Sequence, residues 1–421
     1  MSLILKNGTY IDINTLAFTS TDILVDETSG QLKFSADNPF TDAQISGAVT
    51  EDCSGKYIMH SFADGYQRPC LSMAFAHKEF DQHQLTYFRY LTQILWKVDD
   101  LMDEDLLYAS ALYAAITSAK NGTTFAVCRN ESTKYIDGAL NTIKKAFDEV
   151  GVTTLLSFAA SQSNGFGAAS KIIEANMNYM VDNQALMGIA ASYLATNEIL
   201  EEVVRLCRKN NRGVLINVAE DNLDQANTMR DYKRRVVSRL YESGLMDFSS
   251  SILTNANYLD EHELDLINDK PAWVAQNPYG NFQRGILPFN SKWTEYNFML
   301  GTDFSGASIP QCMRTAYYQS LGTENYKSSQ QVYNSMNAVH NYIKINNFAG
   351  DGDNNLIVFS NPTPMTLDKS NFIKHLAYNF SNRDINMVIS DGKIIVKDGT
   401  ITLIDEKDAL KLCTEQLKRI T

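Results

Sequence analysis

The stretch DEDLLYASALYAAITSAKNGTTFAVC, from Asp103 to Cys128, contains one complete helix-and-strand unit. Asp103 is a typical helix N-cap, and it precedes a helical pattern over 104–120. Asn121 and Gly122 are residues that commonly end a helix, and the apolar run 123–128 is typical of a buried strand. The stretch therefore predicts a helix, a tight turn and a strand in succession.

The same alternation continues along the middle of the chain. Further helices are expected over 136–150, 167–180, 197–210, 231–243 and 261–268. Strands are expected over 57–63, 123–128, 152–158, 186–190, 214–218, 251–254, 273–276 and 298–300. Eight strands alternating with helices predict an α/β protein with a (β/α)₈ TIM barrel, whose active site would lie at the carboxyl ends of the strands.

The two ends of the chain have a different pattern. Residues 3–25 mix short β-branched runs with turn residues, and residues 387–404 contain the turn pairs Asp391-Gly392 and Asp398-Gly399 between apolar runs. We expect both ends to build one small β-sandwich domain, formed by 1–56 plus 350–421 with a C-terminal helix. The barrel domain would then cover 57–349.

Charge and cysteine usage exclude several classes of partner. With 37 Lys and Arg against 49 Asp and Glu, the net charge of −12 repels phosphate backbones, so no nucleic acid is expected. No apolar run approaches the roughly 18 residues of a membrane span, so no membrane is expected either. Six cysteines without a C-x-x-C pair are typical of reduced thiols, which indicates a cytoplasmic protein.

Polar side chains without histidine follow the expected strands. The residues are Tyr66, Gln67 and Arg68 after strand one, Asn217 and Glu220 after strand five, Asn255 after strand six, Gln276 and Asn277 after strand seven, and Asp303 after strand eight. The six histidines, His60, His77, His83, His262, His340 and His375, fall elsewhere. Because amides are poor ligands for zinc, iron or manganese, the pattern gives only a weak signal for a catalytic metal.

Over nearly its whole length the chain resembles the amidohydrolase superfamily, and within it the SsnA-like putative aminohydrolases, near the chlorohydrolases and guanine deaminases. The resemblance rests on the β ends that bracket a barrel and on the order of several segments: GKYIM at 55–59, LWKVD at 95–99, the block 103–124, the block 214–221 and NPTP at 361–364. It implies hydrolysis of non-peptide C–N bonds in small nitrogenous compounds. It also implies zinc or another divalent metal that activates water, with a glutamate after strand five to move protons.

The family's metal ligands are replaced at most positions of this sequence. In the family pattern, a His-x-His pair falls on Tyr66 and Arg68, and two further histidines fall on Asn217 and Asn255. Ala190 and Gln276 stand where the subgroup has other histidines. Only Glu220 and Asp303 keep the residue type that the chemistry uses, with Asn277 and Asn281 keeping nearby structural positions. We therefore expect no metal at this site and no other cofactor.

Three functions follow as alternatives. In the first, the chain is a catalytically degenerate amidohydrolase that keeps the barrel and binds a small nitrogenous ligand in a polar pocket or pairs with partners. In the second, it is an active hydrolase in which Asp303 or Glu220 acts as a general base without metal. In the third, it is a structural subunit that no longer binds small molecules and serves only in a homo- or hetero-oligomer. Because related barrels are often homodimers, a homodimer is expected.

One contact is expected to compensate for the lost metal. Strands one and eight are neighbours in a closed barrel, so Arg68 and Asp303 would lie close together. Asp303 would be a partly buried carboxylate, which must be paired or protonated. A planar guanidinium suits it well, so we expect Arg68 to pair with Asp303. The alternative is that Arg68 points into solvent.

Overall fold

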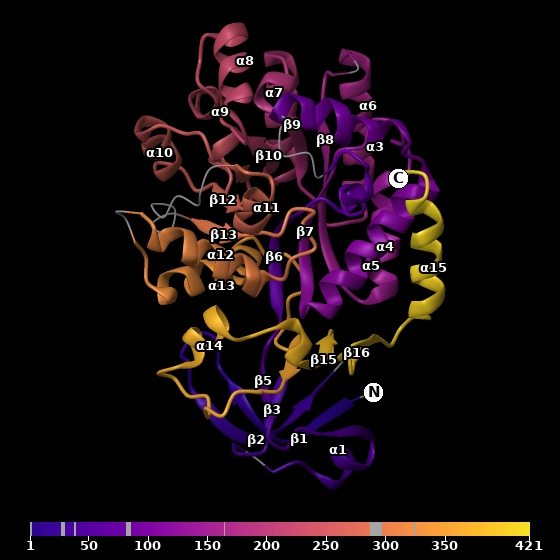
Figure 1. Ribbon diagram of the computed structural model, residues 1–421, viewed down its shortest axis with the longest axis vertical. Helices are drawn as coiled ribbons and strands as arrows, with labels where there is room; N and C mark the ends of the chain where they lie inside the picture. Colours follow the sequence, from indigo (N-terminus) through magenta and orange to yellow (C-terminus); the bar gives the residue numbers. More distant parts are fainter. Residues whose placement is uncertain are drawn as a thin grey trace.

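The structure is a computed structural model that describes residues 2–26, 30–37, 39–80, 86–163, 165–286, 297–323 and 326–421. It contains a barrel of parallel strands and, below it in Figure 1, a β domain to which both ends of the chain contribute. The expected fold class is confirmed.

The eight barrel strands form one sheet in chain order, and all of their pairings are parallel. They are β6 (Phe62–Gln67), β7 (Thr123–Asn130), β8 (Thr153–Ala160), β9 (Met187–Ala191), β10 (Val214–Val218), β11 (Ile252–Asn255), β12 (Trp273–Gln276) and β13 (Phe298–Leu300). The barrel closes where Gln67 forms a parallel bridge with Asp303 and the Asp303 amide donates to the Tyr66 carbonyl at 2.9 Å. This contact brings the residue after β6 beside the residues after β13.

Helices surround the barrel, and most of those expected from the sequence are among them. They are α2 (Tyr87–Tyr90), α3 (Trp96–Asp100), α4 (Glu104–Lys120), α5 (Ala139–Val150), α6 (Phe166–Met180), α7 (Asn197–Asn210), α8 (Asn222–Tyr232), α9 (Val236–Ser243), α10 (Glu261–Asn268), α11 (Pro278–Gln283), α12 (Ile309–Leu321) and α13 (Ser329–Ile345). The Asp103 side chain caps α4 by accepting from the Leu106 amide at 3.0 Å. The helix expected over 231–243 begins only at Val236, because Lys233 has a φ of +56° and separates α8 from α9.

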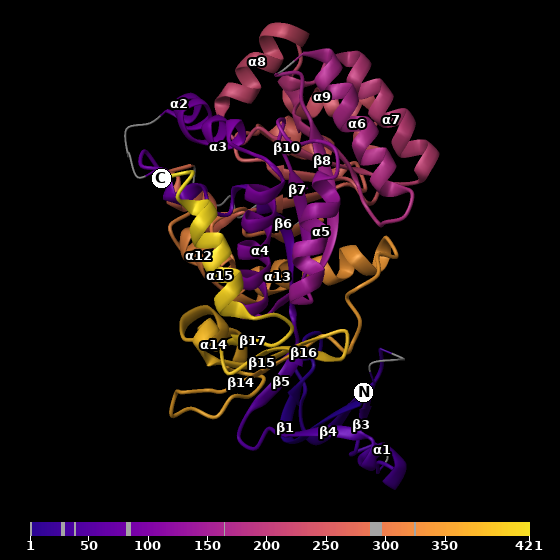
Figure 2. The same cartoon turned by 90° about the vertical axis from the view of Figure 1, so that its right-hand side faces the viewer.

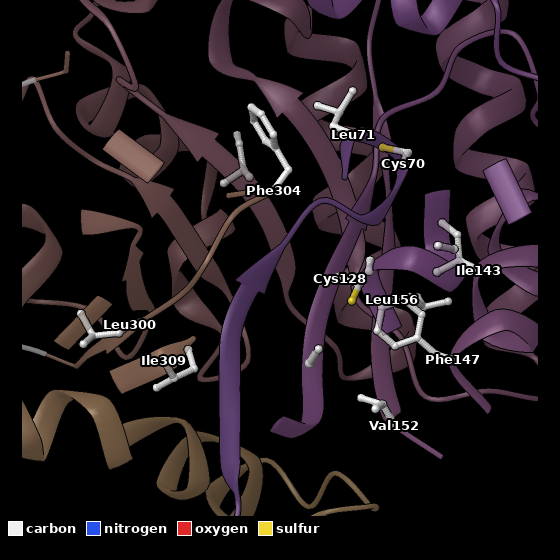
Figure 3. Packing of buried hydrophobic residues seen from close by; sticks show 14 of the residues in the cluster. Cys70, Leu71, Cys128, Ile143, Phe147, Val152, Leu156, Leu300, Phe304 and Ile309 are labelled. Atoms are coloured by element: carbon white, nitrogen blue, oxygen red, sulfur yellow. The ribbon is translucent and has the colours of Figure 1, made fainter. Parts of the chain in front are cut away.

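Apolar side chains fill the layer between the strands and the helices. Leu140, Ile143 and Phe147 recur every three or four residues on α5, so they share one face of that helix. All three are buried in the same cluster as Cys128 of β7 and Leu156 of β8. Figure 3 shows Ile143 and Phe147 close to these two strand residues. This packing fixes the strands whose far ends carry the polar residues described below.

The expected first barrel strand, 57–63, is wrong as a single element. β5 (Tyr57–His60) ends before Ser61, and β6 begins at Phe62. β5 pairs with β1 and β14 in the sheet of the chain ends, whereas β6 pairs with β7 in the barrel. Tyr66 and Gln67 are therefore inside the first barrel strand instead of after it.

The β domain is one mixed sheet in the order β17-β16-β15-β14-β5-β1-β2-β3, with β4 also paired to β1. Its strands are β1 (Ser2–Ile11), β2 (Phe18–Val25), β3 (Leu32–Phe34), β4 (Ala48–Asp52), β5, β14 (Leu356–Phe359), β15 (Ile385–Ser390), β16 (Lys393–Lys397) and β17 (Thr400–Ile401), with α1 (Asp42–Ser46) before β4 and α14 (Phe372–Tyr378) before β15. Leu5, Ile23, Ile58, Val358 and Ile389 are fully buried in one cluster, so strands from both chain ends share a core.

Both hairpin turns expected near the C-terminus are present. Asp391 and Gly392 have φ values of +48° and +75°, and Asp398 and Gly399 have +49° and +76°. Two successive residues with positive φ are typical of type I′ turns, whose twist matches that of the paired strands. The residue pairs named in the sequence therefore set the register of β15, β16 and β17.

The C-terminal helix α15 (Glu406–Leu417) returns to the barrel and packs along α4, as Figure 2 shows. Its Cys413 thiol donates to the Ala109 carbonyl at 3.4 Å, and Glu406 pairs with Lys120 at the end of α4. All six cysteines are free and buried, as expected. Among the described helices, none is long and apolar enough to cross a membrane.

Candidate active site

Three guanidinium groups and three carboxylates converge at the carboxyl ends of the barrel strands. Arg68 follows β6, Arg129 is the second-last residue of β7, Glu131 follows β7, Glu220 follows β10, Arg284 follows α11 and Asp303 follows β13. Only Glu131 is appreciably exposed, at 21% of its side chain. We call these six residues the charged cluster. Its formal charges sum to zero, which makes its burial possible.

Arg68 binds Asp303 through two parallel hydrogen bonds. Its Nε donates to Oδ1 at 2.5 Å and its Nη2 to Oδ2 at 2.7 Å. Both side chains are buried, and the guanidinium lies 4.8 Å from the centre of the Phe304 ring. The expected Arg68–Asp303 pair is confirmed, and the alternative that Arg68 points into solvent is wrong.

Arg284 is a second cation on the same carboxylate, and sequence reasoning missed it. Its Nη2 donates to Asp303 Oδ2 at 3.0 Å, and its Nη1 pairs with Glu220. Asn281 also accepts from Nη2 at 2.9 Å, which orients the guanidinium. The only signal in the sequence was the position of Arg284 three residues after Asn281, a spacing that lets two helical side chains meet.

Arg129 and Glu131 extend the charged cluster toward β9, the fourth barrel strand. Neither residue was predicted from the sequence. Glu131 accepts from Arg68 Nη1 at 3.2 Å and also pairs with Arg129. Arg129 Nη1 donates to the Ala190 carbonyl at 3.2 Å. Ala190 is the position at which the resemblance implies a histidine, and a guanidinium from β7, two strands away in the sheet, reaches the backbone there.

Glu220 is held as a carboxylate. Burial opposes its ionisation, but the charges of Arg284 and Arg68 outweigh burial and lower its pKa to about 2. The Tyr87 hydroxyl donates to its Oε2 at 2.8 Å, and Asn217 Nδ2 donates to the same oxygen at 2.6 Å. A carboxylate with so low a pKa is a weak base at neutral pH.

The three asparagines of strands five to seven form a hydrogen-bonded chain that ends on Glu220. Asn277 Nδ2 donates to Asn255 Oδ1 at 3.0 Å, and Asn255 Nδ2 donates to Asn217 Oδ1 at 2.8 Å. All three side chains are buried. The side-chain oxygens of Asn217 and Asn255 therefore already accept a hydrogen bond from a neighbouring amide.

A cavity of about 250 Å³ opens beside the charged cluster. Its described lining includes Arg68, Arg129, Glu131, Asn217 and Glu220, with Tyr87, Trp96 and Tyr193 among the aromatic side chains. The remaining expected pocket residues, Tyr66, Asn255, Gln276 and Asn277, lie outside the described lining. All four are buried, and the ring of Tyr66 lies 5.6 Å from the Arg129 guanidinium. Of the predicted site residues, the structure thus brings Arg68, Asn217 and Glu220 to the described lining of this cavity.

A model of the amidohydrolase family matches residues 74–395, which is well over half of the chain. The chain belongs to the amidohydrolase family. The matched stretch includes five of the six members of the charged cluster and all barrel strands after β6. The expected superfamily is therefore confirmed.

The chain is similar to several deaminases in sequence or in fold. The 5'-deoxyadenosine deaminase of Methanococcus vannielii is 24% identical over 356 residues, covering 79% of this chain and 82% of the deaminase. The crystal structure of a Xanthomonas campestris adenosine deaminase with bound zinc superimposes with a TM-score of 0.82 at 14% identity, covering 99% and 98% of the chains. The structure of E. coli guanine deaminase superimposes with a TM-score of 0.78 at 14% identity, covering 94% of this chain and 99% of the deaminase.

The residues of this amidohydrolase-family barrel do not fit a metal ion at the family position. The five residues at that position are Tyr66, Arg68, Asn217, Asn255 and Asp303. Of these, Arg68 offers only N–H donors and a positive charge. It already binds Asp303, the one metal ligand of the family pattern whose residue type this chain keeps. The oxygens of Asn217 and Asn255 are engaged in the amide chain. A divalent ion would have to displace a buried guanidinium and compete with its charge.

The described histidines make no hydrogen bond or ion pair with the charged cluster. His77 accepts from the Glu79 amide, His262 is exposed on α10, and His375 is buried in α14. His83 lies outside the described residues. His60 and His340 lie together with Asp351 near the junction with the β domain, and these three form the one group among the described residues that could hold a metal ion.

Proposed function

We propose that the barrel mouth of this chain binds a small nitrogen-containing molecule and does not catalyse metal-dependent hydrolysis. One observation carries this proposal: the Arg68 guanidinium binds Asp303 at the place where the family's metal would sit. A cation that belongs to the chain thereby satisfies the carboxylate, and no step through a metal follows from these residues.

Two features of the cavity support a binding role. Glu131 is partly exposed and presents a carboxylate that can accept from an amine or an amide N–H. Tyr87, Trp96 and Tyr193 give aromatic surface against which a flat ring can pack. The names of the relatives, which include 5'-deoxyadenosine, adenosine and guanine deaminases, suggest purines and their nucleosides as probes.

The geometry disfavours the other two functions considered for this chain. Hydrolysis with Glu220 as a metal-free base requires a carboxylate that takes up a proton, whereas Arg284 and Arg68 lower the pKa of Glu220 to about 2. A purely structural subunit has no need of a polar cavity beside a charged cluster. The homodimer, the cytoplasmic location and the SsnA-like subgroup remain predictions.

Ligand binding and turnover can be measured on the same protein. With 5'-deoxyadenosine, adenosine or guanine, we expect no release of ammonia, with or without added zinc, because the residues do not fit the metal. We expect at least one of these compounds to raise the melting temperature, since a ligand that binds only the folded state stabilises it. Glu131→Gln should remove that shift, and Glu201→Gln, on the exposed surface of α7, should keep it.

Two outcomes would contradict the proposal. Zinc-dependent release of ammonia would show that the family chemistry operates despite Arg68. If none of the three compounds raises the melting temperature, and Glu131→Gln melts at the same temperature as the parent chain, the structural subunit is favoured.

A further inference from the structure

Two histidines and an aspartate meet at the junction between the barrel and the β domain. His60 is the last residue of β5, His340 lies on α13, and Asp351 lies between α13 and β14. One possible ligand atom from each residue lies within 4.8 Å of those of the other two. The rings of His60 and His340 stand 4.6 Å apart at 76° to one another. All three side chains are mostly buried, at 13%, 15% and 5% exposed.

Two lone-pair atoms face each other within this group. His60 Nδ1 lies 3.1 Å from the Ser61 carbonyl. A carbonyl can only accept, so in the neutral ring Nδ1 carries the proton and Nε2 carries the lone pair. That Nε2 points at Asp351 Oδ1, 3.9 Å away. Asp351 Oδ1 is buried and has no hydrogen-bond partner among the described residues.

This arrangement differs from an ordinary ion pair. The other oxygen of the same carboxylate, Oδ2, lies 2.7 Å from His340 Nδ1, as a hydrogen-bonded pair would. With a neutral His60, the buried Asp351 Oδ1 faces an acceptor and receives no hydrogen bond from the described part of the chain, which costs free energy. The hydrogen bond from a ring nitrogen to a backbone carbonyl is also the contact that orients metal-binding histidines.

The backbone holds Asp351 in place without any ion. Gly350 has a φ of +101°, and a Cβ there would lie 2.3 Å from Thr153 Cγ2, so this turn requires glycine. Asn355 Nδ2 donates to the Gly350 carbonyl at 2.9 Å, and the Ser61 amide donates to the Asn355 carbonyl at 3.0 Å. The aspartate is therefore tied to the segment that carries His60.

We propose that His60, His340 and Asp351 form a binding site for a divalent transition metal ion, with zinc as the fitting ion. Two imidazoles and a carboxylate are a common set of three zinc ligands, with water in the fourth position. Ligand atoms of tetrahedral zinc stand about 3.4 Å apart, as follows from bond lengths near 2.0–2.1 Å. Small side-chain movements from the present separations reach that geometry.

Such an ion would join three segments that are distant in the sequence. β5 belongs to the sheet of the chain ends, α13 covers the barrel, and the loop after α13 leads back into that sheet. The site thus lies where the two domains meet, away from the barrel mouth. Its role is to fasten the β domain to the barrel, and it does not depend on the function proposed for the mouth.

The full chain, stripped of metal with a chelator and dialysed, tests this proposal by titration with zinc. We expect one zinc ion per chain by calorimetry, a rise in melting temperature, and no comparable binding of magnesium or calcium, which prefer oxygen ligands. His340→Gln and Asp351→Asn should each weaken zinc binding by more than about 100-fold, beyond the ~10–100-fold typical of outer contacts. His262→Gln, at an exposed histidine on α10, should bind like the parent chain.

Cobalt, added in place of zinc, gives a second readout that an ion pair between the histidines and Asp351 would not produce. Its visible absorption should indicate four-coordination in the parent chain and vanish in His60→Gln, a variant that also carries the test if His340→Gln fails to fold. Absence of stoichiometric zinc binding, or binding that survives both His60→Gln and His340→Gln, would overturn the proposal. Zinc binding lost only in Asp303→Asn would place the metal at the barrel mouth, and would overturn the proposed function as well.

Discussion

Replacing Arg68 by alanine is expected to lower the free energy of unfolding by about 3 kcal/mol, as typical for one lost partner of a buried ion pair. In the parent chain, three guanidinium groups balance three carboxylates at the barrel mouth. Removing Arg68 leaves Asp303 and Glu220 with Arg284 as their one remaining cation in the cluster. Urea unfolding of the purified variant measures the loss.

A double-mutant cycle separates this electrostatic effect from lost packing. Arg68→Ala combined with Asp303→Asn should recover much of the stability, because the orphaned charge is removed together with its partner. Arg205→Ala provides a matched control, since Arg205 makes the same two-bond contact with Glu202 but is 60% exposed. That variant should lose less than about 1 kcal/mol. Additive losses of unfolding free energy in the cycle would show that the Arg68–Asp303 pair does not stabilise the barrel mouth.

Placing a charge in the core of the β domain is expected to have a still larger effect. Ile389 on β15 is fully buried against strands from the other end of the chain. Ile389→Asp would bury an unpaired carboxylate and should cost more than about 4 kcal/mol, enough to prevent soluble expression. Thr400→Asp, at an exposed position of β17, should express like the parent chain. The soluble fraction after lysis measures both.

Deletion of residues 387–421 tests the same dependence at the level of the domain. The deletion removes most of β15, all of β16 and β17, and α15, so the core strand β14 and the outer face of α4 lose their cover. We expect insoluble protein. A truncated chain that stays soluble and melts like the full chain would show that the two ends of the chain do not depend on one another.

The barrel could be predicted because its signals are local. The helix from 104 to 120 starts at a capping aspartate and ends at Asn121, as predicted, and the type I′ turns near the C-terminus contain the expected residue pairs. The split of 57–63 into two strands could not be predicted in the same way. Both halves are short and largely apolar, and the division depends on pairing with β1, which lies far away in the sequence.

The site shows the same division between local and distant information. Closure of a barrel places the ends of strands one and eight side by side, so the Arg68–Asp303 pair followed from the order of the strands. Arg284 contacts Glu220 across 64 residues through a helix whose orientation depends on the whole fold. Residue types alone do not indicate which of 37 lysines and arginines will reach a buried carboxylate.

An anomalous difference map, recorded at the zinc edge from crystals grown with zinc, shows whether Arg68 or a metal ion occupies the barrel mouth. We expect the Arg68 guanidinium to lie on Asp303, with no zinc peak within ligand distance of that carboxylate. A peak at His60, His340 and Asp351 would belong to the separate site at the domain junction. A zinc peak bound to Asp303, with Arg68 displaced from it, would show that the barrel mouth holds the family's metal after all.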